Sequence, residues 1–169
     1  MRRGIIITLE PWEYFQGFVC GIGRLVSNWN RPDASHYNTR AMEENRNAQP
    51  AAALCELAVA KYLNQYWHGS VWTMQDHGKY RHLPDVGTNI EVRRVRTRNG
   101  ITIRNSDAGM HVWGARCVDS EYREIEILGF VVADDYLPIK GKSLVVPFAE
   151  LKKPWEEDEE GRPARKSAS

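Results

Sequence analysis

The chain has 169 residues, which is enough for one hydrophobic core but short for two. No apolar run approaches the roughly 18 residues of a membrane-spanning helix, so we expect a soluble protein without a membrane partner. The formal net charge of +1 does not indicate a globally basic nucleic-acid binder. Three well-separated cysteines form no C-x-x-C pair, and no signal-peptide cleavage site follows the basic N-terminus. These features favour the cytoplasm.

The first predicted element is a helix from about Leu9 to Ser27, which Thr8 can cap. Its apolar residues recur with helical spacing, at Trp12, Phe15, Val19, Ile22 and Val26. The adjacent face carries Glu13, Gly17, Cys20 and Arg24, and the helix contains two further glycines, Gly21 and Gly23. Because glycine lowers helix stability, its repetition suggests that another backbone approaches this face closely.

A polar stretch over residues 28–49 predicts a long loop, and a second helix is expected from Pro50 to about Trp67. Short segments rich in β-branched and aromatic residues then predict strands: GSVWTM, NIEVRRVRT, GITIRN, MHVWGARCV, EIEILGFVVA and the start of KSLVVPFAELKK. Arg98 to Gly100, "RNG", predicts a hairpin between the second and third of them. The expected fold is α+β, with a mostly antiparallel central sheet flanked by helices. We place one domain at residues 1–152 and a charged, disordered tail at 153–169.

Glu56 is the first candidate functional residue. On the second helix it shares a stripe with Ala53, Ala60 and Leu63, so its carboxylate should face the protein interior. A buried charge without a partner costs several kcal/mol, so Glu56 requires a cation, a metal ion or a proton. An ion pair with an arginine is the simplest of these alternatives.

A second group of candidates lies in "PDVGTNIEVRR". In an extended strand, Glu91 and Arg93 project to one face while the flanking isoleucine and valine project to the other. The intervening V-G-T-N permits a tight reversal that returns Asp85 beside Glu91. Two converging carboxylates, with the helical Glu56 nearby, supply the hard oxygen ligands that Mg²⁺ prefers.

These residues resemble the PD-(D/E)XK nuclease superfamily. Pro84-Asp85 corresponds to "PD", Glu91-Val92-Arg93 to the "E-x-K" element, and Glu56 to the family's helical glutamate. Roughly residues 9 to 150 also resemble small phage and prophage proteins associated with that superfamily, through LEPWEYFQGFVCGIGR, LCELAVAKYLNQYWHGSV, PDVGTNIEVRR, ITIRNSD and EILGFVVADDYL. The resemblance implies a restriction-endonuclease-like core and a phage protein acting on DNA.

The resemblance also implies residue roles. Asp85 and Glu91 would bind Mg²⁺ or Mn²⁺, Glu56 would complete or orient the site, and Arg93 would hold the scissile phosphate. The family usually has lysine where this chain has Arg93. A guanidinium stays protonated, so Arg93 cannot act as a base although it can bind phosphate in a bidentate manner. Arginine at position 93 is compatible with an active nuclease and also with a degenerate site that only binds nucleic acid.

A cluster of arginines adjoins the motif and could neutralise DNA phosphates: Arg94, Arg96, Arg98 and Arg104. A solvated strand face explains such a cluster equally well. The second hypothesis is therefore a non-catalytic protein that binds nucleic acid or inhibits a host protein. Asp107 is expected to cap a turn rather than bind a metal ion. Nucleases of the family often act as dimers, which makes a homodimer compatible with the sequence without marking an interface.

Overall fold

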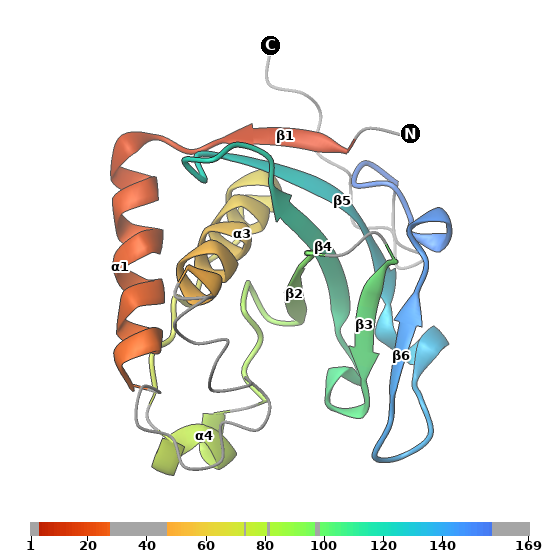
Figure 1. The fold of residues 1–169 in the computed structure, drawn as a ribbon. Coiled ribbons are helices and arrows are strands. Elements are labelled where there is room, and N and C mark those ends of the chain that lie inside the picture. The colour runs from red at the N-terminus through yellow and green to blue at the C-terminus, as the bar shows by residue number, and fades with distance from the viewer. Residues whose placement is uncertain (1–3, 28–46, 73, 81, 97–98, 157–169) are drawn as a thin grey trace.

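A four-stranded sheet with a helix packed against it lies at the centre of the computed structural model, which describes residues 4–27, 47–72, 74–80, 82–96 and 99–156 (Figure 1). The sheet has the order β1-β5-β4-β2. Its strands are β1 (Ile5–Thr8), β2 (Ile90–Arg94), β4 (His111–Cys117) and β5 (Glu124–Val132). β2 runs parallel to β4, and the other pairs are antiparallel. The α+β class and the mostly antiparallel sheet are thus confirmed.

A second sheet pairs β3 (Ile101–Arg104) with β6 (Ser143–Val146) in antiparallel register. The hairpin predicted at Arg98 to Gly100 is therefore wrong, because β2 pairs with β4 and β3 pairs with β6. Gly100 lies so close to β6 that an added Cβ would be 2.0 Å from the Val146 carbonyl oxygen. Local turn chemistry at "RNG" did not reveal this distant partner.

The expected strand GSVWTM is also absent from the described residues, and helix α4 (Met74–Tyr80) begins within it. Side chains of α1 (Pro11–Ser27) form hydrogen bonds with backbone carbonyl oxygens of this segment, which in a strand would bond to a neighbouring strand. Cys20 Sγ lies 3.3 Å from the Gly69 oxygen, and Arg24 Nε donates to the Ser70 oxygen at 2.8 Å. The final segment agrees with the sequence, since β6 is followed by a short 3-10 helix, η4 (Phe148–Glu150).

Helix α3 (Ala48–Leu63) packs on the central sheet, and α1 (Pro11–Ser27) packs on α3 (Figure 1). The glycine-bearing face of α1 makes this contact, as its composition predicted. A Cβ at Gly21 would lie 2.2 Å from the Pro50 Cα, and one at Gly17 would lie 2.7 Å from a Leu54 methyl group. The two helices therefore approach at backbone distance, and α3 is buried along most of its length.

Two further 3-10 helices, η2 (Asn105–Asp107) and η3 (Ala133–Tyr136), follow β3 and β5. None of the described helices is both long and apolar enough to cross a membrane. Residues 157–169 of the expected tail lie outside the described residues, as does most of the loop expected over residues 28–49.

Candidate functional site

Asp85 lies in a tight reversal that enters β2. Its backbone N–H donates to the Ile90 oxygen at 2.9 Å, and Val86 and Ile90 exchange two further backbone hydrogen bonds. Gly87 has a φ of +57°, the left-handed conformation that glycine adopts without strain. The reversal turns the Asp85 side chain back along the strand, where its Oδ2 accepts a hydrogen bond of 2.8 Å from the Val92 N–H. The expected return of Asp85 to β2 is confirmed.

Strand β2 divides its side chains as the alternation predicted. Ile90 and Val92 are buried in the core, whereas Glu91 and Arg93 lie on the opposite face and are partly exposed. Arg93 Nη1 contacts Glu91 Oε1, and its Nε donates to the Thr102 oxygen at 3.2 Å. Glu91 and Arg93 are thus paired with each other beside Asp85.

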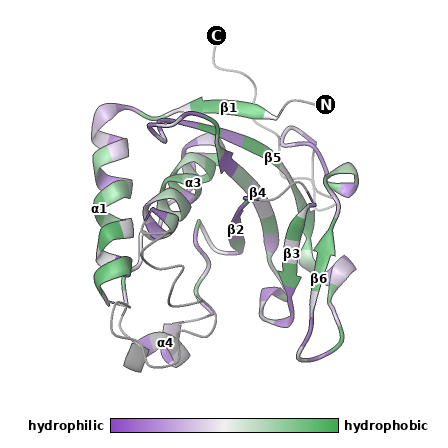
Figure 2. Cartoon of the chain, viewed as in Figure 1, coloured by the Kyte–Doolittle hydropathy of each residue, from purple (hydrophilic) through white to green (hydrophobic). Residues whose placement is uncertain are grey.

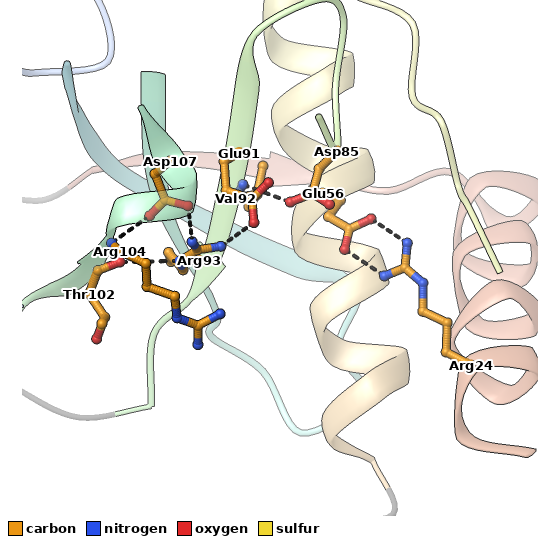
Figure 3. Close-up of polar contacts among 9 residues, drawn as sticks. All are labelled: Arg24, Glu56, Asp85, Glu91, Val92, Arg93, Thr102, Arg104 and Asp107. Carbon is orange, nitrogen blue, oxygen red and sulfur yellow. Dashed lines mark hydrogen bonds and ion pairs between the residues drawn. The ribbon is translucent and has the colours of Figure 1, made fainter. Parts of the chain in front are cut away.

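Glu56 is buried in the middle of α3 and forms the ion pair that the sequence offered as its simplest alternative. Arg24 of α1 donates from Nη1 and Nη2 to the two Glu56 oxygens at 2.5 and 2.9 Å (Figure 3). Trp67 Nε1 also donates to Oε2, at 3.1 Å. Both Glu56 oxygens therefore have donors, and its carboxylate is held in one orientation between two helices.

Asp107 plays a larger part than its expected turn role. It does cap η2, since its Oδ2 accepts the Arg104 N–H at 2.8 Å. Its Oδ1 also accepts a hydrogen bond of 2.6 Å from Arg93 Nη2. The guanidinium of Arg93 is therefore held between Glu91 and Asp107 (Figure 3). No spacing in the sequence pointed to this pair, because it joins β2 to a turn after β3.

Among the described residues, the charges of this region do not balance. The acidic cluster, as we call it, has four described carboxylates and two described guanidinium groups, which leaves two negative charges in excess when all are ionised: Glu56, Asp85, Glu91 and Asp107 against Arg24 and Arg93. Burial raises the pKa of Asp85 well above its usual range, and the charges of Glu56 and Glu91 raise it further. Burial likewise raises the pKa of Glu91, although Arg93 opposes the change.

Asp85 differs from Glu56 and Glu91 in having no ion-pair partner among the described residues. Glu56 is paired with Arg24, and Glu91 is paired with Arg93. A carboxylate that is desolvated beside other carboxylates is stabilised by a proton or by an added cation.

The fit of the predicted metal ligands is partial. Among the residues that the structure describes, no group of three or more His, Cys, Asp or Glu side chains is arranged to hold a metal ion. Asp85 and Glu91 supply oxygen donors of the kind that Mg²⁺ prefers, and the excess charge of the acidic cluster matches a divalent cation. Glu91 would have to turn from Arg93 to contribute a ligand. Both Glu56 oxygens already accept hydrogen bonds, so Glu56 fits a role in orienting the site better than a role as a metal ligand.

Three of the four arginines in the predicted nucleic-acid patch lie among the described residues. Arg94 projects to the opposite face of β2 from Arg93, on the side of the Cys117 thiol, whose pKa is lowered by a hydrogen bond with Cys55 and further by the Arg94 charge. Arg96 and Arg104 are exposed, and Arg98 lies outside the described residues. Alternation separates Arg94 from Arg93, because adjacent residues of a strand project to opposite faces.

Comparisons of the chain with protein-family models, with curated proteins and with solved structures found no match.

Proposed function

We propose that the protein is a metal-dependent nuclease of phage type, with a restriction-endonuclease-like core, that hydrolyses phosphodiester bonds in DNA. The observation that carries the proposal is the gathering of carboxylates around Asp85, a desolvated side chain fixed by the Val92 N–H and without an ion pair among the described residues. Such a site is stabilised by a divalent cation, for which Mg²⁺ and Mn²⁺ have the appropriate preference for oxygen ligands.

Asp85 and Glu91 would hold the cation in this proposal. When bound, it would polarise the scissile phosphate and lower the pKa of a coordinated water. Arg93 would hold the phosphate, because its guanidinium is fixed beside Glu91 and Asp107 and is of the kind that donates to two phosphate oxygens at once. Arg93 remains protonated and supplies no base. Release of Glu91 from Arg93 would free a ligand and a phosphate donor at the same time.

Glu56 and Arg24 would act together as a support for the site. Their bidentate pair joins α1 to α3 and places both charged groups near Asp85. The charge of Glu56 raises the pKa of Asp85, and the charge of Arg24 lowers it. Neither group needs to touch the substrate. This assigns Glu56 the orienting alternative among the roles that the sequence suggested.

A second candidate function is supported by the arginine pairs. Glu56 and Glu91 are each neutralised by an arginine, which is the arrangement expected if the carboxylates serve structure. The protein would then be a catalytically degenerate nuclease fold that binds nucleic acid, or a phage protein that inhibits a host protein. Exposed Arg96 and Arg104 would be the first arginines to test for DNA binding.

The deciding experiment compares cleavage of supercoiled and single-stranded DNA with Mg²⁺, Mn²⁺ or EDTA. Asp85→Asn is the central variant, because asparagine can still accept the Val92 N–H while it removes the charge. Asp135→Asn is the matched control, since Asp135 is exposed on η3. We expect metal-dependent cutting by the wild type and by Asp135→Asn, and none by Asp85→Asn.

Thermal unfolding with and without Mg²⁺ gives a second readout that does not require activity. We expect Mg²⁺ to raise the Tm of the wild type and of Asp135→Asn but not that of Asp85→Asn. Equal Mg²⁺ effects on all three proteins, with no cutting in any condition, would contradict the nuclease proposal. DNA binding that persists in EDTA and weakens steeply with salt would then favour the second candidate.

A further inference from the structure

Helix α1 presents an apolar stripe to solvent. We define the α1 seam as the five side chains on its outer face, which are between 38% and 70% exposed: Trp12, Phe15, Val19, Ile22 and Val26. Figure 2 shows hydrophobic positions along α1, at the margin of the fold and away from the sheet. Single exposed apolar residues are ordinary, but a contiguous stripe along a helix is typical of an interaction surface.

The opposite face of α1 explains why the seam is left outside. Gly17 and Gly21 pack against α3, and the two charged side chains of the helix also point inward. Glu13 pairs with Lys61 of α3 at 2.6 Å, and Arg24 pairs with Glu56. Packing through glycines and buried ion pairs therefore removes every charge of α1 from its outer face. The exposed seam is left both apolar and uncharged.

We infer that the α1 seam is the interface with a second copy of this chain. Its spacings of three, four, three and four residues are those of a heptad seam, in which the apolar side chains of one helix fit between those of a facing helix. A surface that meets its own copy must be complementary to itself. An uncharged seam meets this requirement, since no like charges are brought together.

The order of side chain sizes favours an antiparallel dimer. The seam begins with the aromatic Trp12 and Phe15 and ends with the aliphatic Ile22 and Val26. Antiparallel helices set the aromatic end of one copy against the aliphatic end of the other, which keeps the gap between the helices even. A parallel arrangement would join the bulky ends and separate the small ones. Opposed helix dipoles also favour the antiparallel order.

The area agrees with a weak, reversible dimer. A fully exposed aromatic side chain has a surface of up to about 250 Å². Because the five seam side chains are only partly exposed, their combined accessible area is on the order of 500 Å² per copy. Two copies would bury about 1,000 Å², near the lower limit for a specific interface. This inference does not depend on the proposed nuclease activity, because none of the five residues lies in the acidic cluster.

Sedimentation equilibrium over about 1 to 100 µM protein, the range suited to a micromolar Kd, tests the inference. We expect the wild type to move from one to two copies of the 19.4 kDa chain. Val19→Glu places a charge in the seam and should raise the dimer Kd more than about tenfold. Val145→Glu is the matched control, because Val145 on β6 is 49% exposed against 52% for Val19. It should leave the Kd unchanged.

A charge-pair variant tests the orientation. Phe15→Glu combined with Ile22→Lys brings opposite charges together in an antiparallel dimer and like charges together in a parallel one. We expect the double variant to dimerise more tightly than Phe15→Glu alone. Circular dichroism and thermal unfolding verify that each variant is folded. A wild type that stays monomeric throughout the range, or a dimer that Val19→Glu and Val145→Glu affect equally, would overturn the inference.

Discussion

The Arg24–Glu56 pair offers the most direct test of the site's structure. Arg24→Met keeps much of the side chain's length but removes its charge and its donors. The substitution removes three hydrogen bonds to described residues, two to Glu56 at 2.5 and 2.9 Å and one to the Ser70 oxygen at 2.8 Å. The Arg24 side chain is 15% exposed and that of Glu56 is 7% exposed, so water cannot replace the lost donors fully.

The expected loss is large because a buried carboxylate is left without its cation. Breaking a buried ion pair in this way costs about 3 to 5 kcal/mol of unfolding free energy. For a domain of this size each kcal/mol lowers the Tm by about 2 to 4 °C, so Arg24→Met should lower it by roughly 6 to 20 °C.

Thermal and urea unfolding followed by circular dichroism at pH 7 measure this loss. Lys153→Met serves as the control, because Lys153 and Glu156 form an exposed pair at 4.0 Å that should contribute under about 1 kcal/mol. Adding Glu56→Gln to Arg24→Met removes the unpaired charge and should recover at least about 2 kcal/mol in a double-mutant cycle. If Arg24→Met costs no more than Lys153→Met, the claim that this pair is buried and supports the site is refuted.

Three further outcomes are expected. Because the pKa of Asp85 is raised, the folded protein binds a proton more readily than the unfolded chain, and wild-type stability in EDTA should fall as pH rises from about 3.8 through the raised pKa. Asp85→Asn should lack this part of the decline, so Tm profiles of the two proteins should converge near pH 4 and separate above it; parallel profiles would contradict the shift. Gly21→Ala should destabilise by more than about 1 kcal/mol because its Cβ meets the α3 backbone at 2.2 Å, whereas Gly78→Ala, with no atom within 4 Å, should be neutral or slightly stabilising in urea unfolding. Asp107→Asn weakens the hold on Arg93 and should cost about 1 to 3 kcal/mol by the same assay, and a change below about 0.5 kcal/mol would show that this contact is not maintained in solution.

The sequence by itself determined the features that depend on neighbouring residues. Period-two alternation fixed the faces of Glu91 and Arg93 on β2, and the short V-G-T-N stretch fixed the return of Asp85 to that strand. Glycine spacing on the first helix predicted its close contact with another backbone. These features follow from the rotation per residue of helices and strands and from the conformations that glycine allows.

Tertiary structure alone decided which distant groups meet. The pairing of β3 with β6 depends on the path of some forty residues between them, and the "RNG" turn signal could not report it. The same holds for Arg24 with Glu56 and for Arg93 with Asp107, whose partners lie on separate elements. The glycine face of α1 packs against α3, so the apolar stripe on the opposite face of α1 is exposed to solvent. Local patterns fix which face a side chain occupies, but only the packed chain fixes what lies opposite that face.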